Sequence, residues 1–139
     1  MPTTPRRILI VEDDPDIMRI MSFTLTNAGY QVSRAYGGED ALRKLKTQKF
    51  DLVLTDLAMP RVSGVEVIAA VKANPESRQV PCLAVTAFTW DQIAQSAGQV
   101  GCVGFIGKPF TGDQLLREVE KYLSASSTDR RPNQRSEAG

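Results

Sequence analysis

Residues 51–56 read DLVLTD, a short run of aliphatic and β-branched residues that ends in an aspartate. Four similar runs occur along the chain, each separated from the next by a longer stretch that contains helix-like spacing of apolar residues. These runs are RRILIVE (6–12), YQVSRA (30–35), CLAVT (82–86) and VGFIG (103–107). Short apolar runs that alternate with amphipathic helices are typical of a parallel sheet covered by helices on both faces. The sequence therefore predicts an α/β fold with five strands.

The pattern within each run predicts its place in the sheet. The runs at 6–12, 51–56 and 82–86 are continuously apolar, as expected of central strands buried on both faces, whereas the run at 30–35 alternates and is expected at an edge. Between the runs, apolar residues recur every three or four positions, and Gly29 lies where the first helix should end. The predicted helices span residues 15–28, 39–47, 65–73, 91–100 and 114–123.

The composition is that of one globular domain. Of 139 residues, 42% are hydrophobic and 24% are charged, and no apolar run approaches the roughly 20 residues that a membrane span needs. Seventeen basic residues nearly cancel sixteen acidic ones, so charge gives no support to binding of nucleic acid or an anionic membrane. We expect an N-terminal extension at 1–5, one domain at 6–123 and a disordered polar tail or linker at 124–139.

The apolar segment at residues 8–11 is too short for the core of a signal peptide, which makes a cytoplasmic location the expectation. The chain contains no histidine, and its two cysteines are Cys82 and Cys102. A Cys/His zinc site, catalysis that uses histidine, and a phosphohistidine on this chain are therefore excluded. We expect Cys82 and Cys102 to be buried free thiols.

Carboxylates end two of the predicted strands. Glu12, Asp13 and Asp14 follow the first strand, and Asp56 ends the third. Ligands of open parallel sheets bind beyond the carboxyl ends of the strands, and carboxylates that converge there repel one another unless a cation lies among them. A few oxygen ligands from the protein, completed by water and phosphate, suit Mg²⁺. Asp14 precedes Pro15 and is better explained as a helix N-cap than as a metal ligand.

Two further strand ends supply polar groups. Thr86 ends the fourth strand and has a hydroxyl that can donate to a phosphate oxygen, and Lys108 follows the fifth strand with an ammonium that can reach the same oxygens. A hydroxyl, an ammonium, a metal ion and a nucleophilic carboxylate are the groups that phosphoryl transfer requires. The strand ends therefore indicate a phosphoryl-transfer site.

Four blocks, VEDD (11–14), DLAMPRVSG (56–64), VTA (85–87) and KPF (108–110), together with their spacing, resemble the receiver domain of bacterial two-component response regulators over about residues 6–123. The resemblance implies a flavodoxin-like, doubly wound α/β fold with strand order 2-1-3-4-5 and five helices. It also implies phosphorelay signalling, in which a histidine kinase or histidine phosphotransferase donates the phosphoryl group. Such a domain is not a conventional enzyme, since it catalyses only its own phosphorylation and the hydrolysis of its phosphoaspartate.

The resemblance assigns roles to the acidic residues. Asp56 would be the phosphoacceptor. Asp13 and Asp56 would bind Mg²⁺ directly, and Glu12 would act largely through water. The backbone carbonyl of Ala58 would supply a further ligand.

It also assigns a switch. Thr86 and Lys108 would hold the phosphoryl oxygens, and the bond from Lys108 to Pro109 would be cis. Thr86 would shift toward the phosphate and Phe105 would move inward behind it, although a plain core role for Phe105 is the alternative. This pair would reshape the surface of the fourth helix, fifth strand and fifth helix, where a downstream protein would bind.

Two positions that flank the phosphoryl group in this family carry apolar residues here, Ala58 and Phe88. They predict hindered attack by water, and hence a longer phosphorylated lifetime than in an Ala58→Asn, Phe88→Glu variant. The alternative is that Phe88 and Trp90 form part of an exposed partner-binding patch.

Two other functions stay open at this stage. The chain could be a receiver cut from a longer response regulator or hybrid kinase, with the polar tail as a linker. A magnesium-dependent phosphatase that passes through an aspartyl phosphate would share the acidic site. Such an enzyme needs a second general acid near the nucleophile and a cap over the substrate, but position 58 is alanine and the loops are short.

Overall fold

Five parallel strands form one sheet in the order β2-β1-β3-β4-β5, which confirms the predicted topology. The computed structural model describes residues 5–59, 61–87 and 101–127. Its strands are β1 Arg7–Val11, β2 Gln31–Ala35, β3 Leu52–Thr55, β4 Cys82–Thr86 and β5 Cys102–Gly107. The strand expected at an edge, β2, lies at an edge.

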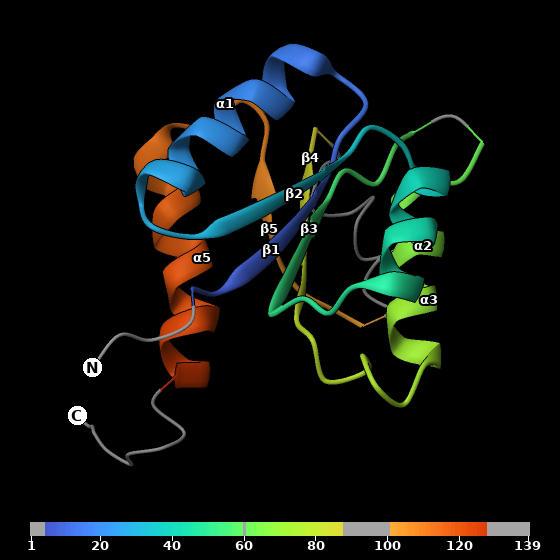
Figure 1. Ribbon diagram of the computed structural model, residues 1–139. Coiled ribbons are helices and arrows are strands. Elements are labelled where there is room, and N and C mark those ends of the chain that lie inside the picture. Colours follow the sequence, from blue (N-terminus) through green and yellow to red (C-terminus); the bar gives the residue numbers. More distant parts are fainter. Residues whose placement is uncertain (1–4, 60, 88–100, 128–139) are drawn as a thin grey trace.

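Four helices lie in the described part of the chain, and they form two layers around the sheet. They are α1 Pro15–Asn27, α2 Gly38–Thr47, α3 Gly64–Ala73 and α5 Gly112–Ser127. Figure 1 shows α1 and α5 on one side of the sheet and α2 and α3 on the other. The helix predicted at 91–100 lies outside the described residues.

Among the described residues, the predicted boundaries agree with the observed ones to within one residue, except at the two ends of α5. This helix continues to Ser127, four residues beyond the predicted end at Leu123. The residues SASS at 124–127 have no apolar period, yet none of them is a glycine or proline that would break a helix. Low apolar content alone was therefore a poor marker of the end of this helix.

Each face of the sheet packs against one helical layer. Along β1, Ile8 and Ile10 join the core under α1 and α5, and Leu9 and Val11 join the core under α2 and α3. All four side chains are at most 1% exposed. Burying such a side chain contributes roughly 1.5–3 kcal/mol. Because both faces are covered, the central strands need the continuous apolar runs seen in the sequence.

Capping of α1 fixes the direction in which the chain leaves β1. The Asp14 carboxylate accepts hydrogen bonds from the backbone N–H groups of Asp16 at 2.9 Å and Ile17 at 3.3 Å. Pro15 occupies the first turn, and Gly29 follows the C-cap with φ of 100°. The capping role predicted for Asp14 is confirmed, and its carboxylate is engaged away from the acidic cluster.

The two cysteines differ in exposure. Both are free thiols, but only Cys82 is fully buried, and Cys102 is partly exposed. The prediction of two buried thiols is therefore wrong for Cys102, because this residue begins β5, which forms an edge of the sheet.

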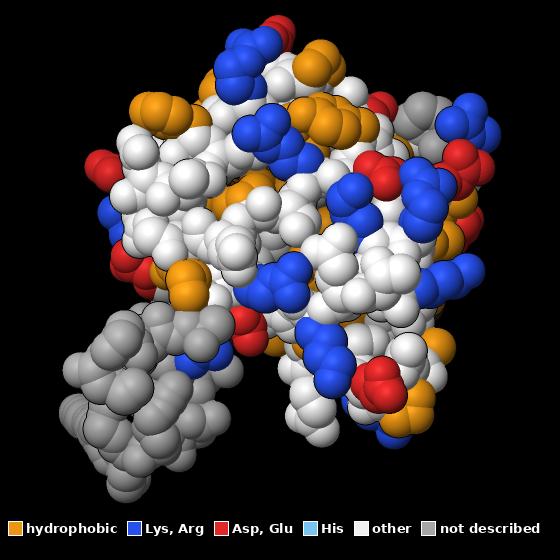
Figure 2. Space-filling model, in the orientation of Figure 1, with side chains coloured by type: hydrophobic (Ala, Val, Ile, Leu, Met, Phe, Trp, Pro, Cys, Tyr) orange, Lys and Arg blue, Asp and Glu red, His pale blue; other side chains and the backbone are white. Residues whose placement is uncertain are grey.

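Charged groups are dispersed over the one face of the molecule that Figure 2 shows. Lys and Arg side chains are scattered over the face shown in Figure 2, with Asp and Glu side chains among them. In the described part of the chain, no helix has the length and apolar character needed to cross a membrane.

Candidate functional site

The sheet register brings the acidic residues together at one edge. Val11 pairs with Thr55, so the residues that follow them, Glu12 and Asp56, leave neighbouring strands side by side. The backbone ladder continues through this point, since the Asp56 N–H donates to the Val11 carbonyl at 3.0 Å. Carboxylate oxygens of Glu12, Asp13 and Asp56 all lie within 4.8 Å of one another.

The three carboxylates differ in burial. Glu12 is 1% exposed and Asp56 is 7% exposed, whereas Asp13 is exposed to solvent. Burial raises the pKa of Glu12, and its contact with Lys108 opposes that shift. The cluster thus has a shielded side, formed by Glu12 and Asp56, and an open side at Asp13.

Lys108 lies between the two buried carboxylates. Its Nζ is 2.7 Å from Glu12 Oε1 and 2.9 Å from Asp56 Oδ2, and its side chain is 15% exposed. Burial by itself would lower the pKa of Lys108, but the contacts with Glu12 and Asp56 outweigh burial and raise it. The Lys108–Pro109 bond is cis, as predicted, and the Lys108 N–H donates to the Thr86 carbonyl at 2.9 Å.

The oxygen atoms of this cluster suit a hard cation. Glu12 Oε1 is buried and accepts no well-aligned hydrogen bond from the described residues, although the Lys108 ammonium is close. A buried carboxylate oxygen of this kind is costly unless it is hydrogen-bonded, paired with a charge or bound to a metal. An all-oxygen donor set with one open side fits Mg²⁺, which keeps several of its waters.

The carboxylate of Asp56 is held at both oxygens. Oδ2 accepts from Lys108 Nζ at 2.9 Å, and Oδ1 accepts from the Ala58 N–H at 3.2 Å. The loop after β3 packs so closely against the Asp56 backbone at Gly64 that a Cβ on Gly64 would overlap the Asp56 carbonyl oxygen. The ligand role predicted for the carbonyl of Ala58 stays a prediction.

The predicted switch residues lie on adjacent strands. Thr86 is the last residue of β4 and is fully buried, and it pairs with Gly107 of β5. Phe105 pairs with Ala84 and packs, partly buried, against the core that includes Ala84. Their positions are compatible with coupled movement, which stays a prediction. Phe88 and Trp90 lie outside the described residues.

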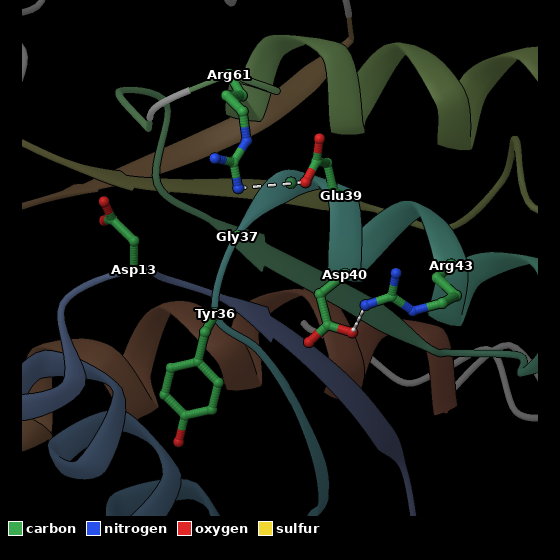
Figure 3. Close-up of a pocket in the computed structure, with 8 residues that line it drawn as sticks. Asp13, Tyr36, Gly37, Glu39, Asp40, Arg43 and Arg61 are labelled. Carbon is green, nitrogen blue, oxygen red and sulfur yellow. Dashed lines mark hydrogen bonds and ion pairs between the residues drawn. The ribbon is translucent and has the colours of Figure 1, made fainter.

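A pocket of about 320 Å³, which was not predicted from the sequence, opens beside Asp13. Figure 3 shows Asp13 at one side of this pocket and the ion pair between Arg61 and Glu39, 3.3 Å long, at another. Arg61 has φ of 64°, which is uncommon for a residue other than glycine. The ion pair joins the loop after β3 to the start of α2, so the open side of the acidic cluster faces a walled recess.

The site and fold agree with comparisons to known proteins. The family model described as response regulator receiver domain matches residues 8–120. The polar-differentiation response regulator DivK of Brucella anthropi is 33% identical over 119 residues, which cover 86% of this chain and 97% of that protein.

Solved structures give the same result. The chemotaxis response regulator CheY4 of Vibrio cholerae is 33% identical, with a TM-score of 0.81, and the match covers 86% of this chain and 99% of that one. The receiver domain of the sensor histidine kinase PA1611 from Pseudomonas aeruginosa is 27% identical, with a TM-score of 0.81 over 87% of this chain and 99% of that one. That structure has a magnesium ion coordinated in its active site cleft.

Proposed function

This chain belongs to the response regulator receiver domain family, and on that premise we propose that Asp56 is the residue that accepts the phosphoryl group. The chain is a signalling receiver of the phosphorelay type, which takes its phosphoryl group from a phosphohistidine donor. The donor histidine, of a histidine kinase or histidine phosphotransferase, lies outside these 139 residues, which contain no histidine.

One observation carries the assignment of Asp56. Two buried carboxylates lie beside the Lys108 ammonium, Asp56 at 2.9 Å and Glu12 at 2.7 Å, and the Asp56 side chain is the more accessible of the two, at 9% exposed against 1% for Glu12. In the proposed reaction an Asp56 oxygen attacks phosphorus, the phosphorus–nitrogen bond of phosphohistidine breaks, and the imidazole leaves with the bonding electrons. Lys108 then pairs with an oxygen of the transferred group, and the Thr86 hydroxyl donates to another.

Glu12, Asp13, Asp56 and the carbonyl of Ala58 would hold Mg²⁺. Support comes from the clustered carboxylate oxygens and from the magnesium ion in the cleft of the PA1611 receiver domain. When bound, the ion supplies positive charge against the carboxylates and the phosphoryl oxygens. The protein itself fixes Asp56 through Ala58 and Lys108, so little reorganisation is needed at the reacting oxygen.

Phosphorylation would be passed on through Thr86 and Phe105. Movement of these residues would reshape the surface around β5 and α5, together with the segment 91–100, and a downstream protein would bind there. The cytoplasmic location and the domain limits at 6 and 123 stay predictions of the sequence. A place within a longer protein is also compatible with the match, since the PA1611 receiver belongs to a sensor histidine kinase.

Incubation with phosphoramidate and Mg²⁺, followed by intact mass measurement, tests the acceptor. We expect the wild-type chain to gain one phosphoryl group and Asp56→Asn to gain none. Asp16→Asn is the matched control, because it makes the same change at an exposed carboxylate on α1. Asp13→Asn should still be phosphorylated, with a weaker dependence of the rate on Mg²⁺ concentration. If Asp56→Asn is modified as fully as the wild type, the acceptor has been assigned wrongly.

The residues Ala58 and Phe88 lead to a separate proposal about lifetime. We expect the phosphorylated wild type to lose its phosphoryl group more slowly than an Ala58→Asn, Phe88→Glu variant, since apolar side chains hinder the attacking water. Dephosphorylation followed by intact mass gives both rates, and equal rates would remove the basis for this role.

A further inference from the structure

The two cysteines begin neighbouring strands at the edge of the sheet opposite Asp56. Cys82 is the first residue of β4 and Cys102 the first of β5, and their Cα atoms are register partners. Neighbouring strands lie about 4.7–4.9 Å apart. That spacing falls inside the range of roughly 4.4–6.8 Å between Cα atoms in disulfides. The backbone thus places the two residues at a distance that a disulfide can bridge.

Both thiols also project from the same face of the sheet. Cys82 belongs to the core under α2 and α3, and Cys102 packs against that same core. The next pair on this face is Ala84 and Phe105, and both of these residues contact the same core. A register shift between Cys82 and Leu83 adds one residue to β5, so that Cys102 and Phe105 both lie on this face although they are three residues apart. The pair is therefore aligned in direction as well as in spacing.

The two thiols differ in accessibility, which sets an order of reaction. Cys82 is fully buried, and burial raises its pKa to about 11, so it stays a thiol at neutral pH. Cys102 is partly exposed and donates its S–H to the Gly104 carbonyl at 2.8 Å. We therefore expect an oxidant to react first at Cys102, while Cys82 lies buried on the neighbouring strand.

A lysine supplies positive charge close to both positions. Lys72 Nζ donates to the Val80 carbonyl at 2.9 Å, and its charge opposes the effect of burial on the Cys82 pKa. Its Cε lies 3.1 Å from the place where a Cβ on Gly101 would be, next to Cys102. The Lys72 charge thus partly offsets the effect of burial at Cys82, whose thiolate is its reactive form.

We propose that Cys82 and Cys102 form an oxidisable dithiol that closes to a disulfide when the chain meets a peroxide. The Cys102 sulfur attacks a peroxide oxygen, the oxygen–oxygen bond breaks, and a sulfenic acid and one water form. The Cys82 sulfur then attacks the Cys102 sulfur, the sulfur–oxygen bond breaks, and a second water carries away the Cys82 proton. The two thiols together lose two protons and two electrons, and hydrogen peroxide takes up both to become two waters.

The product would tie β5 to β4 three residues before Phe105. This site is separate from the phosphoacceptor, because it lies at the amino ends of the strands and Asp56 lies beyond a carboxyl end. Failure of the proposed function would leave this chemistry unchanged.

Oxidation of the full, reduced chain with hydrogen peroxide tests the proposal. Intact mass should fall by two hydrogen atoms in the monomer, peptide mapping should join the segments that contain Cys82 and Cys102, and dithiothreitol should reverse both changes. The Cys82→Ala variant should instead gain oxygen atoms at Cys102. The Cys102→Ala variant should be oxidised roughly a hundredfold more slowly at neutral pH than an ordinary exposed thiol, because burial raises the pKa of its remaining thiol, Cys82, from 9.0 to about 11.

The wild-type mapping decides the matter even if a variant folds poorly. A wild type that gains oxygen at Cys102 while Cys82 keeps a free thiol would overturn the proposal. A disulfide that joins two chains, with none inside a chain, would overturn it equally.

Discussion

Replacement of Lys108 by methionine removes an ammonium that lies against two buried carboxylates. The change keeps a long side chain, so packing of the stem is largely preserved. The side chains of Glu12 and Asp56 are 1% and 9% exposed and would then face each other without that cation. We expect the free energy of unfolding at neutral pH, without Mg²⁺, to fall by a large amount.

The size of the effect follows from burial. Removal of one partner from a buried ion pair costs about 3–5 kcal/mol, and the 15% exposure of Lys108 reduces this to about 2–4 kcal/mol. The matched control is Lys121→Met, which breaks a pair with Glu118 of similar length, 3.0 Å. The Lys121 side chain is 56% exposed, so its loss should cost roughly 0–1 kcal/mol.

Two conditions should restore part of the stability that the Lys108→Met variant loses. Lower pH should narrow its deficit, because burial and the loss of the ammonium both raise the pKa of Glu12, and a group with a raised pKa in the folded state stabilises that state as pH falls. Mg²⁺ at a hundred times its dissociation constant adds about 2.7 kcal/mol to the free energy of unfolding. It should stabilise the variant more than the wild type, because in the wild type Lys108 already pairs with the same oxygens.

Urea denaturation of the wild type and both variants, with and without Mg²⁺ and at several pH values, measures all of these effects. The expected result is a large, Mg²⁺-sensitive and pH-sensitive loss in Lys108→Met only. Equal losses in the two variants, with equal gains from Mg²⁺, would refute the argument that Lys108 is the counter-ion of the acidic cluster.

Three further predictions concern stability. The free energy of unfolding, measured by urea denaturation, should fall by about 1–3 kcal/mol in Gly64→Ala, since the new Cβ would overlap the Asp56 carbonyl oxygen. The control Gly37→Ala, whose Cβ meets nothing within 4 Å, should change it by less than ~0.5 kcal/mol, and equal effects would contradict the close approach. Ser22→Ala should gain about 1 kcal/mol in the same assay, because the buried Ser22 hydroxyl has no hydrogen-bond partner among the described residues, and a loss would contradict this. Stability should fall by about 2–3 kcal/mol as pH rises from roughly 9 to 11, because the pKa of Cys82 is raised from 9.0 to about 11; Cys82→Ala should lack this part of the decline, and an identical pH profile would contradict the assignment.

The sheet and the acidic cluster could be predicted because both depend on local sequence. An apolar run long enough for a strand, followed at once by an acid, places that acid at the carboxyl end of the strand. Parallel strands bring all such ends to one edge, so Glu12 and Asp56 could be placed together before their register was known. The cap at Asp14 was predictable for the same reason, since it depends on the next three residues.

Other features depend on contacts between distant parts of the chain. Lys108 was expected near phosphate oxygens, but the pairing of its ammonium with Glu12 and Asp56 depends on the three-dimensional arrangement of three strand ends. The positive φ of Arg61 could not be predicted, because glycine is the residue that usually marks such a backbone conformation and position 61 is an arginine. The partial exposure of Cys102 follows from the place of β5 at the edge of the sheet. The apolar residues around Cys102 in the sequence suggest a buried strand instead.

The charges at the site explain why a divalent ion suits it. Three carboxylates, those of Glu12, Asp13 and Asp56, meet one ammonium, that of Lys108, and so two negative charges are left uncompensated. Mg²⁺ cancels those charges, whereas a monovalent ion would leave the site anionic. A phosphoryl donor is itself an anion, and an uncompensated site would repel it over the last few ångströms, where screening by salt is weakest. Magnesium dependence of phosphorylation should therefore appear mainly in the rate at which anionic donors react, and it should weaken in Asp13→Asn, which has one negative charge fewer.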